Sequence, residues 1–185
     1  MLTAVNRATG AEQEETIARA MAFPMDAIVA RYMDEEGLPS GVAREHEREL
    51  KRYLVLCALD PDGAYGMNGP VDELWHTFIT FTRDYARFCD EVGGRFIHHV
   101  PTAPDAKADP ASAASYRRTL DAYAETFGEE APPEVWPRFG STDHPGSSCL
   151  HHAPSGPGSA CGTAAPAGSA CGSSSPAGSS CTNGT

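Results

Sequence analysis

The stretch that decides the fold is Pro70-Val-Asp-Glu-Leu-Trp-His-Thr-Phe-Ile-Thr-Phe-Thr-Arg-Asp-Tyr-Ala-Arg-Phe-Cys-Asp-Glu-Val-Gly-Gly94. Side chains suited to burial recur in it at alternating steps of four and three residues, the spacing of one helix face. They are Val71, Trp75, Phe78, Thr82, Tyr85 and Cys89. Pro70 suits the first helical position, where its missing N–H would have no partner anyway. We therefore expect one continuous helix with a buried stripe, ended by Gly93 and Gly94.

Two further helices are expected before this stretch. The first, beginning near residue 15, carries an apolar face of Ile17, Met21, Met25, Ile28 and Tyr32. Pro24 interrupts it and predicts either a kink or a new helix start. The second follows Ser40, a suitable N-cap. Its apolar face is expected to hold His46, Leu50, Tyr53, Leu54 and Cys57, and its solvent face Glu45, Glu47 and Lys51.

One more helix is expected downstream. Residues 95–101 form a short extended segment, because the residue before Pro101 avoids the helical region. Asp109 and Pro110 begin the last helix, whose apolar face is Tyr116, Leu120, Tyr123 and Phe127 and whose end is Pro132-Pro133. Trp136 and Phe139 are expected to fold back onto the bundle. No second strand is convincing, so the fold class is predicted to be all-α: a small four-helix domain at residues 15–140 after a flexible N-terminus, residues 1–14.

Residues 141–185 have a different composition. Ser, Gly, Ala and Pro make up 31 of these 45 residues, and Leu150 is their only large aliphatic side chain. Such a chain buries too little surface to offset the entropy of ordering, so a disordered tail is predicted. A short unit recurs in it, as Gly146-Ser-Ser-Cys149, Gly158-Ser-Ala-Cys161, Gly168-Ser-Ala-Cys171 and Gly178-Ser-Ser-Cys181. The other two cysteines, Cys57 and Cys89, lie on apolar faces and are expected to be small core residues.

Charge and hydropathy exclude some classes of protein. All 14 Lys and Arg lie between Arg7 and Arg138, and of the 25 acidic residues only Asp143 lies beyond them. The acidic body argues against binding nucleic acid or anionic lipid, both of which need a basic face. No apolar run is long enough for a membrane span, and the N-terminus lacks a secretory pattern. A cytoplasmic protein with reduced cysteines is therefore expected. The oligomeric state stays open.

The polar residues of the body include a candidate metal site. Asp72 and His76 are four residues apart, so they share a helix face. His98 or His99 could add a third ligand from the extended segment, and such a set suits Zn²⁺ or Fe²⁺. Asp72 could instead hydrogen-bond His76 and hold its tautomer. A second interpretation is purely structural, with His76 tying the helix to residues 95–101.

The motif around these residues resembles a known family. Val71-Asp-Glu-Leu-Trp-His-Thr-Phe78, then Thr82, Tyr85, Phe88-Cys89, Gly94 and Phe96-Ile-His-His-Val-Pro101, resemble the bacterial proteins labelled glycine-rich-domain-protein-like. The Val-Asp-x-x-Trp-His core is also similar to the helical domain of plant glycine-rich domain proteins. The resemblance implies a small helical fold and no settled activity. The plant motif often reads Trp-His-x-His, whereas here Phe78 stands at the second histidine position, so His98 or His99 must supply the partner of His76.

The cysteine repeat leads to three hypotheses. In the first, the protein is a non-catalytic carrier whose tail thiols a peptide-modifying enzyme modifies, because the tail is similar in style to precursors of ribosomally made, modified peptides. In the second, the tail binds Zn²⁺ or Cu(I), which thiolates favour. In the third, an interaction domain has a passive flexible tail. The residues concerned are Cys149, Cys161, Cys171, Cys181, His151 and His152.

An enzyme is the remaining alternative. The chain has no nucleotide-binding glycine motif, no nucleophile elbow and no pair of histidines on one helix. A metal-dependent enzyme would use Asp72, His76 and His98 or His99, with Zn, Fe or Cu as candidate metals. The sequence favours the non-catalytic carrier over this alternative.

Overall fold

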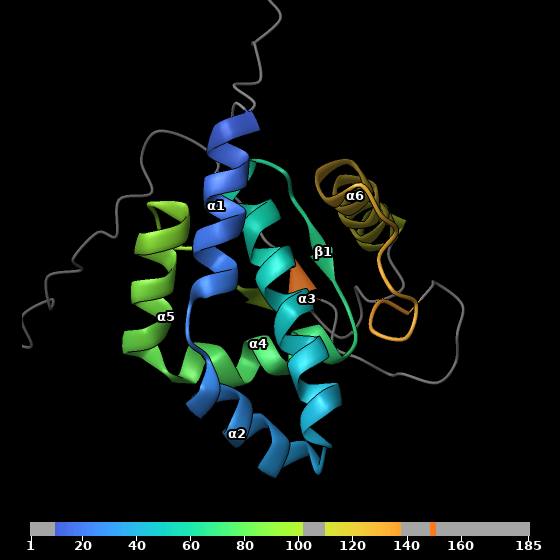
Figure 1. Ribbon diagram of the computed structural model, residues 1–185. Helices are drawn as coiled ribbons and strands as arrows, with labels where there is room; N and C mark the ends of the chain where they lie inside the picture. Colours follow the sequence, from blue (N-terminus) through green and yellow to red (C-terminus); the bar gives the residue numbers. More distant parts are fainter. Residues whose placement is uncertain (1–9, 102–109, 138–148, 151–185) are drawn as a thin grey trace, which may run out of the picture. The chain divides into compact units, whose positions relative to one another are not determined.

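The computed structural model describes residues 10–101, 110–137 and 149–150. In this part of the chain the helices are α1 Gly10–Ala22, α2 Asp26–Glu36, α3 Ser40–Leu59, α4 Pro70–Thr80, α5 Thr82–Phe88 and α6 Pro110–Phe127 (Figure 1). A π-helical turn, Cys89–Gly93, continues α5, and the strands β1 Gly66–Met67, β2 Val100–Pro101 and β3 Cys149–Leu150 have two residues each. The structure confirms the all-α class. No helix among the described residues has the length and apolar character needed to cross a bilayer.

The structure divides two of the four predicted helices, so the prediction of four is wrong. Around Phe23 and Pro24 the chain leaves α1 and starts α2 afresh, one of the two outcomes expected there. The stretch 70–94 also breaks, at Phe81, whose N–H bonds to Phe78 O (3.0 Å) in a three-residue turn. Thr80 Oγ1 donates to Thr77 O (2.7 Å), a local bond that competes with the regular helix. Because the helix restarts here, Thr82 is exposed and is not part of the buried stripe.

The first helix begins earlier than predicted. It starts at Gly10 and not near residue 15. Good helix formers fill its first turns, and Glu12 lies where the helix dipole favours a negative charge. The predicted flexible segment 1–14 is therefore wrong for residues 10–14, while residues 1–9 lie outside the described part.

Helix α3 is the centre of the fold. It contacts α1, α2, α4, α6 and the π turn, and 12 of its 20 residues are buried. The prediction of a solvent face is wrong at Glu47 and Lys51, which are buried and paired at 2.7 Å. Lys51 Nζ also donates to Met21 O (3.3 Å) near the end of α1. Ser40 is the first helical residue after Pro39 and its side chain does not cap the helix.

The cysteines of the body are in the core, as predicted. Cys57 and Cys89 are both buried and free. Burial raises the pKa of each thiol, because the thiolate would lose its hydration. Neither thiol is therefore an activated nucleophile.

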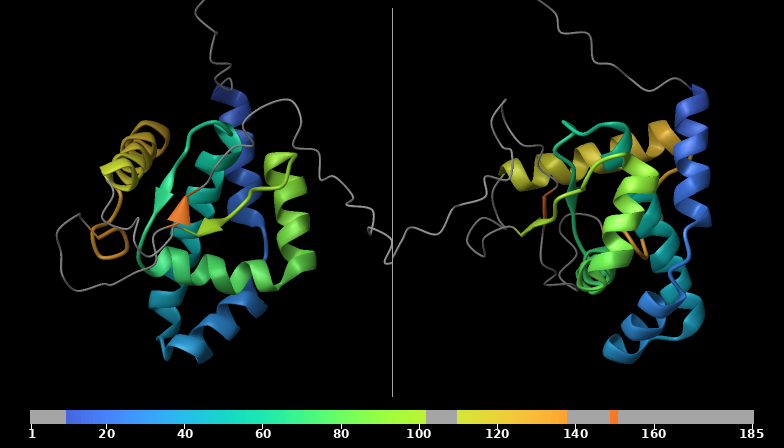
Figure 2. Two further views of the ribbon diagram at one scale, coloured as in Figure 1. Left: turned by 180° about the vertical axis from the view of Figure 1, so that it is seen from behind. Right: turned by 90° about the vertical axis from the view of Figure 1, so that its left-hand side faces the viewer.

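The three short strands form a sheet that the sequence did not reveal. Their order is β1-β3-β2 and both pairs are antiparallel (Figure 2). Leu150 is the partner of both Gly66 and Val100, and Cys149 of both Met67 and Pro101. The predicted boundary at residue 140 is therefore too early, because two residues of the predicted tail belong to the body. The chain divides into units at residues 1–153 and 154–185, and the second lies wholly outside the described residues. The disorder predicted for residues 141–185 also lies outside them, except at residues 149–150, which belong to β3.

The end of α6 and the segment after it close the core. The helix ends before Gly128 (φ 71°), whose N–H bonds to Ala124 O (3.0 Å), earlier than the predicted end at Pro132-Pro133. Trp136 folds back and is 1% exposed, as expected, while Phe139 lies outside the described residues. The indole N–H of Trp136 donates to Glu49 Oε2 of α3 (3.0 Å).

A buried histidine makes stability depend on pH. His46 Nδ1 lies 3.0 Å from Tyr32 Oη, which also donates to Pro70 O (3.2 Å). Burial lowers the pKa of His46, opposed in part by the charge of Glu45. Below the unfolded-state pKa of about 6.5 the unfolded chain then binds more protons than the folded chain, so stability falls as pH falls.

We expect His46→Gln to remove this pH-dependent part of the stability. Urea denaturation at about pH 7.5 and about pH 5.5 should show the free-energy gap between wild type and variant narrowing toward low pH. A constant gap would contradict the prediction.

Candidate metal centre

The first turn of α4 supplies a buried carboxylate. Pro70 starts the helix and Asp72 is its third residue, 0% exposed. At this position a negative charge is favoured by the helix dipole. His76 lies one turn later with its side chain 36% exposed, and its Nε2 is 3.9 Å from Asp72 Oδ1. The predicted shared face of Asp72 and His76 is confirmed.

The segment after the π turn brings a second imidazole to this carboxylate. Gly94 (φ 63°) turns the chain in the left-handed conformation that favours glycine. Ile97 is then held at both its backbone groups, because its N–H lies 3.5 Å from Cys89 Sγ and its carbonyl accepts from Tyr85 Oη (2.5 Å). Two residues further on, His99 Nε2 is 3.2 Å from Asp72 Oδ1.

The structure decides between the two candidate histidines. In an extended segment successive side chains point to opposite sides. Ile97 is buried and the side chain of His99 is 4% exposed, whereas Phe96 and His98 are exposed and their rings lie 5.0 Å apart. His99 therefore joins the cluster, and the prediction that His98 could be a ligand is not supported by the geometry.

The three side chains lie close enough together to hold a metal ion. The ligand atoms of Asp72, His76 and His99 all lie within 4.8 Å of one another. Two ligands of a tetrahedral Zn²⁺ are roughly 3.3 Å apart, as follows from bonds of about 2.0 Å. The Asp72–His99 distance already fits. His76 would have to move inward by about 1 Å, and its side chain, 36% exposed, is the most exposed of the three.

One oxygen of the carboxylate has no partner among the described residues. Asp72 Oδ2 is buried and accepts no hydrogen bond there, and the same is true of Asn68 Oδ1 just before α4. A buried polar atom without a partner is costly, and such atoms often mark a bound ion or water. His99 contacts only Oδ1, so a structural hydrogen bond explains the burial of one carboxylate oxygen and leaves that of Oδ2 unexplained.

An aromatic pair fixes the orientation of His99. The ring of Trp75 meets the ring of His99 edge-on, with centroids 4.5 Å apart. Trp75 Nε1 donates to Tyr85 Oη (3.2 Å), and Tyr85 in turn holds Ile97. Burial raises the pKa of Tyr85, so its hydroxyl stays a donor. The sequence placed both residues in the buried stripe but did not predict this role. The available signal was that a buried Trp or Tyr needs a partner for its polar end.

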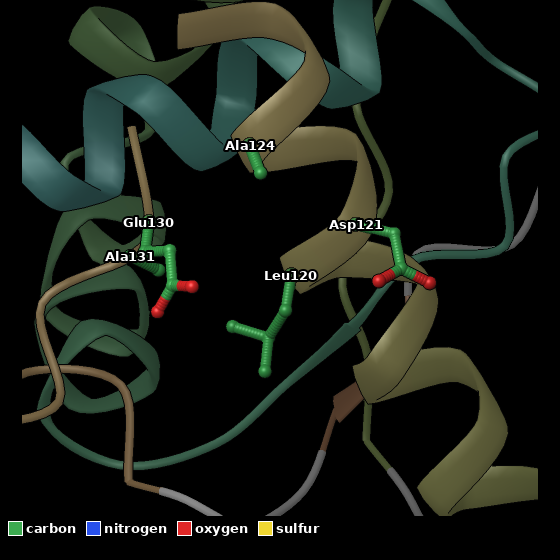
Figure 3. A pocket seen from close by; sticks show the side chains of 5 residues that line it. All are labelled: Leu120, Asp121, Ala124, Glu130 and Ala131. Carbon is green, nitrogen blue, oxygen red and sulfur yellow. The ribbon is translucent and has the colours of Figure 1, made fainter. Parts of the chain in front are cut away.

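The remaining candidate residues lie elsewhere. Cys149 is described only as part of β3, whereas Cys161, Cys171, Cys181, His151 and His152 lie outside the described residues. A pocket at the end of α6 is lined by Leu120, Asp121, Ala124, Glu130 and Ala131. Figure 3 shows Leu120 and Glu130 extending toward the space between them. None of its lining residues belongs to α4 or to residues 95–101, so the pocket is separate from the metal candidate.

The fold and the site together define an all-α domain with a carboxylate–histidine cluster at the start of one helix. The chain belongs to the UCP032817-like family, which matches residues 13–130. The matched range contains Asp72, His76 and His99 and ends before the cysteine repeat. Neither the curated proteins nor the solved structures compared with the chain match it. The resemblance to glycine-rich domain proteins and to modified-peptide precursors stays a prediction.

Proposed function

We propose that this protein binds one divalent transition-metal ion through Asp72, His76 and His99. The observation that supports this most is the buried Asp72 carboxylate, which lies beside two imidazoles and has one oxygen without a hydrogen-bond partner among the described residues. Two neutral imidazoles and one carboxylate leave a bound divalent ion with a single net positive charge. Buried charges are tolerated when they are paired or coordinate a metal.

The donor set favours a reactive site over a structural one. Structural zinc sites have four protein ligands, whereas three protein ligands and an open position are typical of catalytic sites. Two histidines and one carboxylate are also the ligands of many Fe²⁺ oxygenases. Thiolates, which would favour Cu(I), are not among these ligands. Water or a substrate could reach the metal from the side of His76 and Glu73, whose side chains are 36% and 44% exposed. We propose a metal-dependent reaction at this position.

The hypothesis of a non-catalytic carrier concerns a different part of the chain. It depends on modification or metal binding at Cys149, Cys161, Cys171 and Cys181, and on a peptide-modifying enzyme as partner. Apart from the backbone of Cys149, these residues lie outside the described part. The carrier hypothesis therefore stays a prediction, as does a cytoplasmic location.

Metal titration tests the proposed site. In the full-length chain with the four C-terminal cysteines replaced by serine, we expect Zn²⁺ or Fe²⁺ to bind with a stoichiometry near one. His76→Ala and His99→Ala should each weaken binding by at least about 100-fold, since loss of an outer partner alone costs 10–100-fold. Isothermal titration calorimetry measures both quantities.

His98→Ala is the matched control, because it removes the neighbouring imidazole of the same segment. It should change the affinity by less than about 3-fold, a difference of under 1 kcal/mol. Equal losses from His98→Ala and His99→Ala would contradict the assignment. Binding that appears only when the four cysteines are present would assign the metal to the thiols.

A further inference from the structure

The metal centre has two halves, Asp72 and His76 on α4 and His99 on the extended segment. Each half is next in the chain to a short strand, and these two strands do not pair with each other. Asp72 follows β1 by five residues, and His99 immediately precedes β2. In the sheet order β1-β3-β2, both strands pair with β3. The strand that joins the two halves of the site thus comes from the start of the cysteine-repeat region.

The two halves differ in how firmly the rest of the fold holds them. Helix α4 packs against α2, α3 and α5, so Asp72 and His76 sit on an element that is anchored without the sheet. Strand β2 has its main contacts, among the described elements, with β3. His99 therefore lies between two anchors, the bonds at Ile97 on one side and the pairing of Val100 with Leu150 on the other.

We propose that pairing of β3 with β2 is coupled to metal binding, so that the C-terminal segment regulates the site and the metal in turn holds that segment in the sheet. The proposal rests on the metal site proposed above. Linkage requires the effect to be reciprocal: if docked β3 raises the metal affinity by some factor, bound metal stabilises docked β3 by the same factor. Metal occupancy would thereby control how firmly the start of the cysteine repeat is held against the body.

The test uses Zn²⁺ alone and the full-length chain with its four C-terminal cysteines replaced by serine. Leu150→Pro removes an N–H from the central strand of the sheet, where proline breaks the ladder. We expect the Zn²⁺ affinity to fall about 10-fold, as for loss of other groups that orient a ligand. Thr182→Pro, the same kind of change beyond the described residues, should leave the affinity unaltered.

Hydrogen exchange supplies the reciprocal measurement without altering the strand. Amide exchange at residues 149 and 150 should slow about 10-fold when Zn²⁺ is added, and Asp72→Asn should abolish this slowing. Equal Zn²⁺ affinities for Leu150→Pro and its parent, with no change in exchange, would overturn the coupling and leave the metal site standing. If Zn²⁺ binds neither chain, the metal site itself is wrong.

Discussion

Glu49→Ala is expected to lower the free energy of unfolding by about 3–5 kcal/mol, the cost of removing one partner from a buried charged network. The side chain of Glu49 is completely buried in α3. Its Oε2 accepts from Tyr123 Oη (2.9 Å) of α6 and from Trp136 Nε1 (3.0 Å). Its Oε1 lies 3.1 Å from Arg48 Nε. The alanine variant would leave the buried donors of Tyr123 and Trp136 without their acceptor, and α6 and Trp136 would lose their link to the central helix.

Two variants on the same helix make this result specific. Glu49→Gln keeps the shape and one acceptor oxygen, so its cost should be smaller, about 1–3 kcal/mol. Glu45→Ala removes a carboxylate one turn earlier that pairs at the surface with Arg48 (3.4 Å), and should cost less than about 1 kcal/mol. Urea denaturation followed by circular dichroism gives all three values. A cost below about 1 kcal/mol for Glu49→Ala would show that the network is not a main source of stability.

Asp72→Asn is expected to separate metal binding from stability. Without metal, the free energy of unfolding should stay the same or rise by up to about 2 kcal/mol, because a neutral amide of the same shape replaces a buried carboxylate with an unpaired oxygen. Zn²⁺ at 100 times the dissociation constant of the site should stabilise the parent chain with Asp72 by about 2.7 kcal/mol and the Asp72→Asn variant hardly at all. Denaturation with and without Zn²⁺, again with the four C-terminal cysteines replaced by serine, measures both effects.

A structural role for Asp72 would give the opposite pattern. If Asp72 serves to hold His99 by hydrogen bonding, Asp72→Asn should destabilise the metal-free protein and Zn²⁺ should stabilise neither chain. Asp84→Asn is the matched control, because it makes the same change at a surface carboxylate of α5 that pairs with Arg87 (3.1 Å) and is 43% exposed. It should leave the stabilisation by Zn²⁺ nearly unchanged.

Helix positions could be predicted where one face is apolar and the other polar. Trp75, Phe78 and Tyr85 are buried as their spacing indicated. The solvent face predicted for α3 was wrong, because a helix surrounded by other elements buries charged residues too. Glu47 pairs with Lys51 within α3, Lys51 also donates to Met21 O, and Glu49 accepts from Trp136. The strands could not be predicted, since two-residue segments carry no periodicity and β3 pairs with partners far away in the chain.

Half of the candidate site could be derived from spacing alone. Asp72 and His76 share a face in any α-helix, so their proximity followed from the sequence. The choice between His98 and His99 did not follow from the sequence, because each histidine shares its side of the extended segment with apolar residues. Phe96 and Val100 lie on the side of His98, and Ile97 lies on the side of His99. Only the bonds that hold Ile97 inward decide which imidazole reaches Asp72.

The number of residues in the π turn at Cys89–Gly93 sets the direction in which the following chain leaves the helix. A wider turn accommodates one residue more than a regular α-helix would, and each α-helical residue rotates the chain by about 100°. Deleting one residue there would restore a regular turn while the rest of the composition stayed almost unchanged. Everything after it would then leave the helix in a different direction, and His99 would no longer face Asp72. In this part of the protein, chain length matters to the site as much as side-chain identity does.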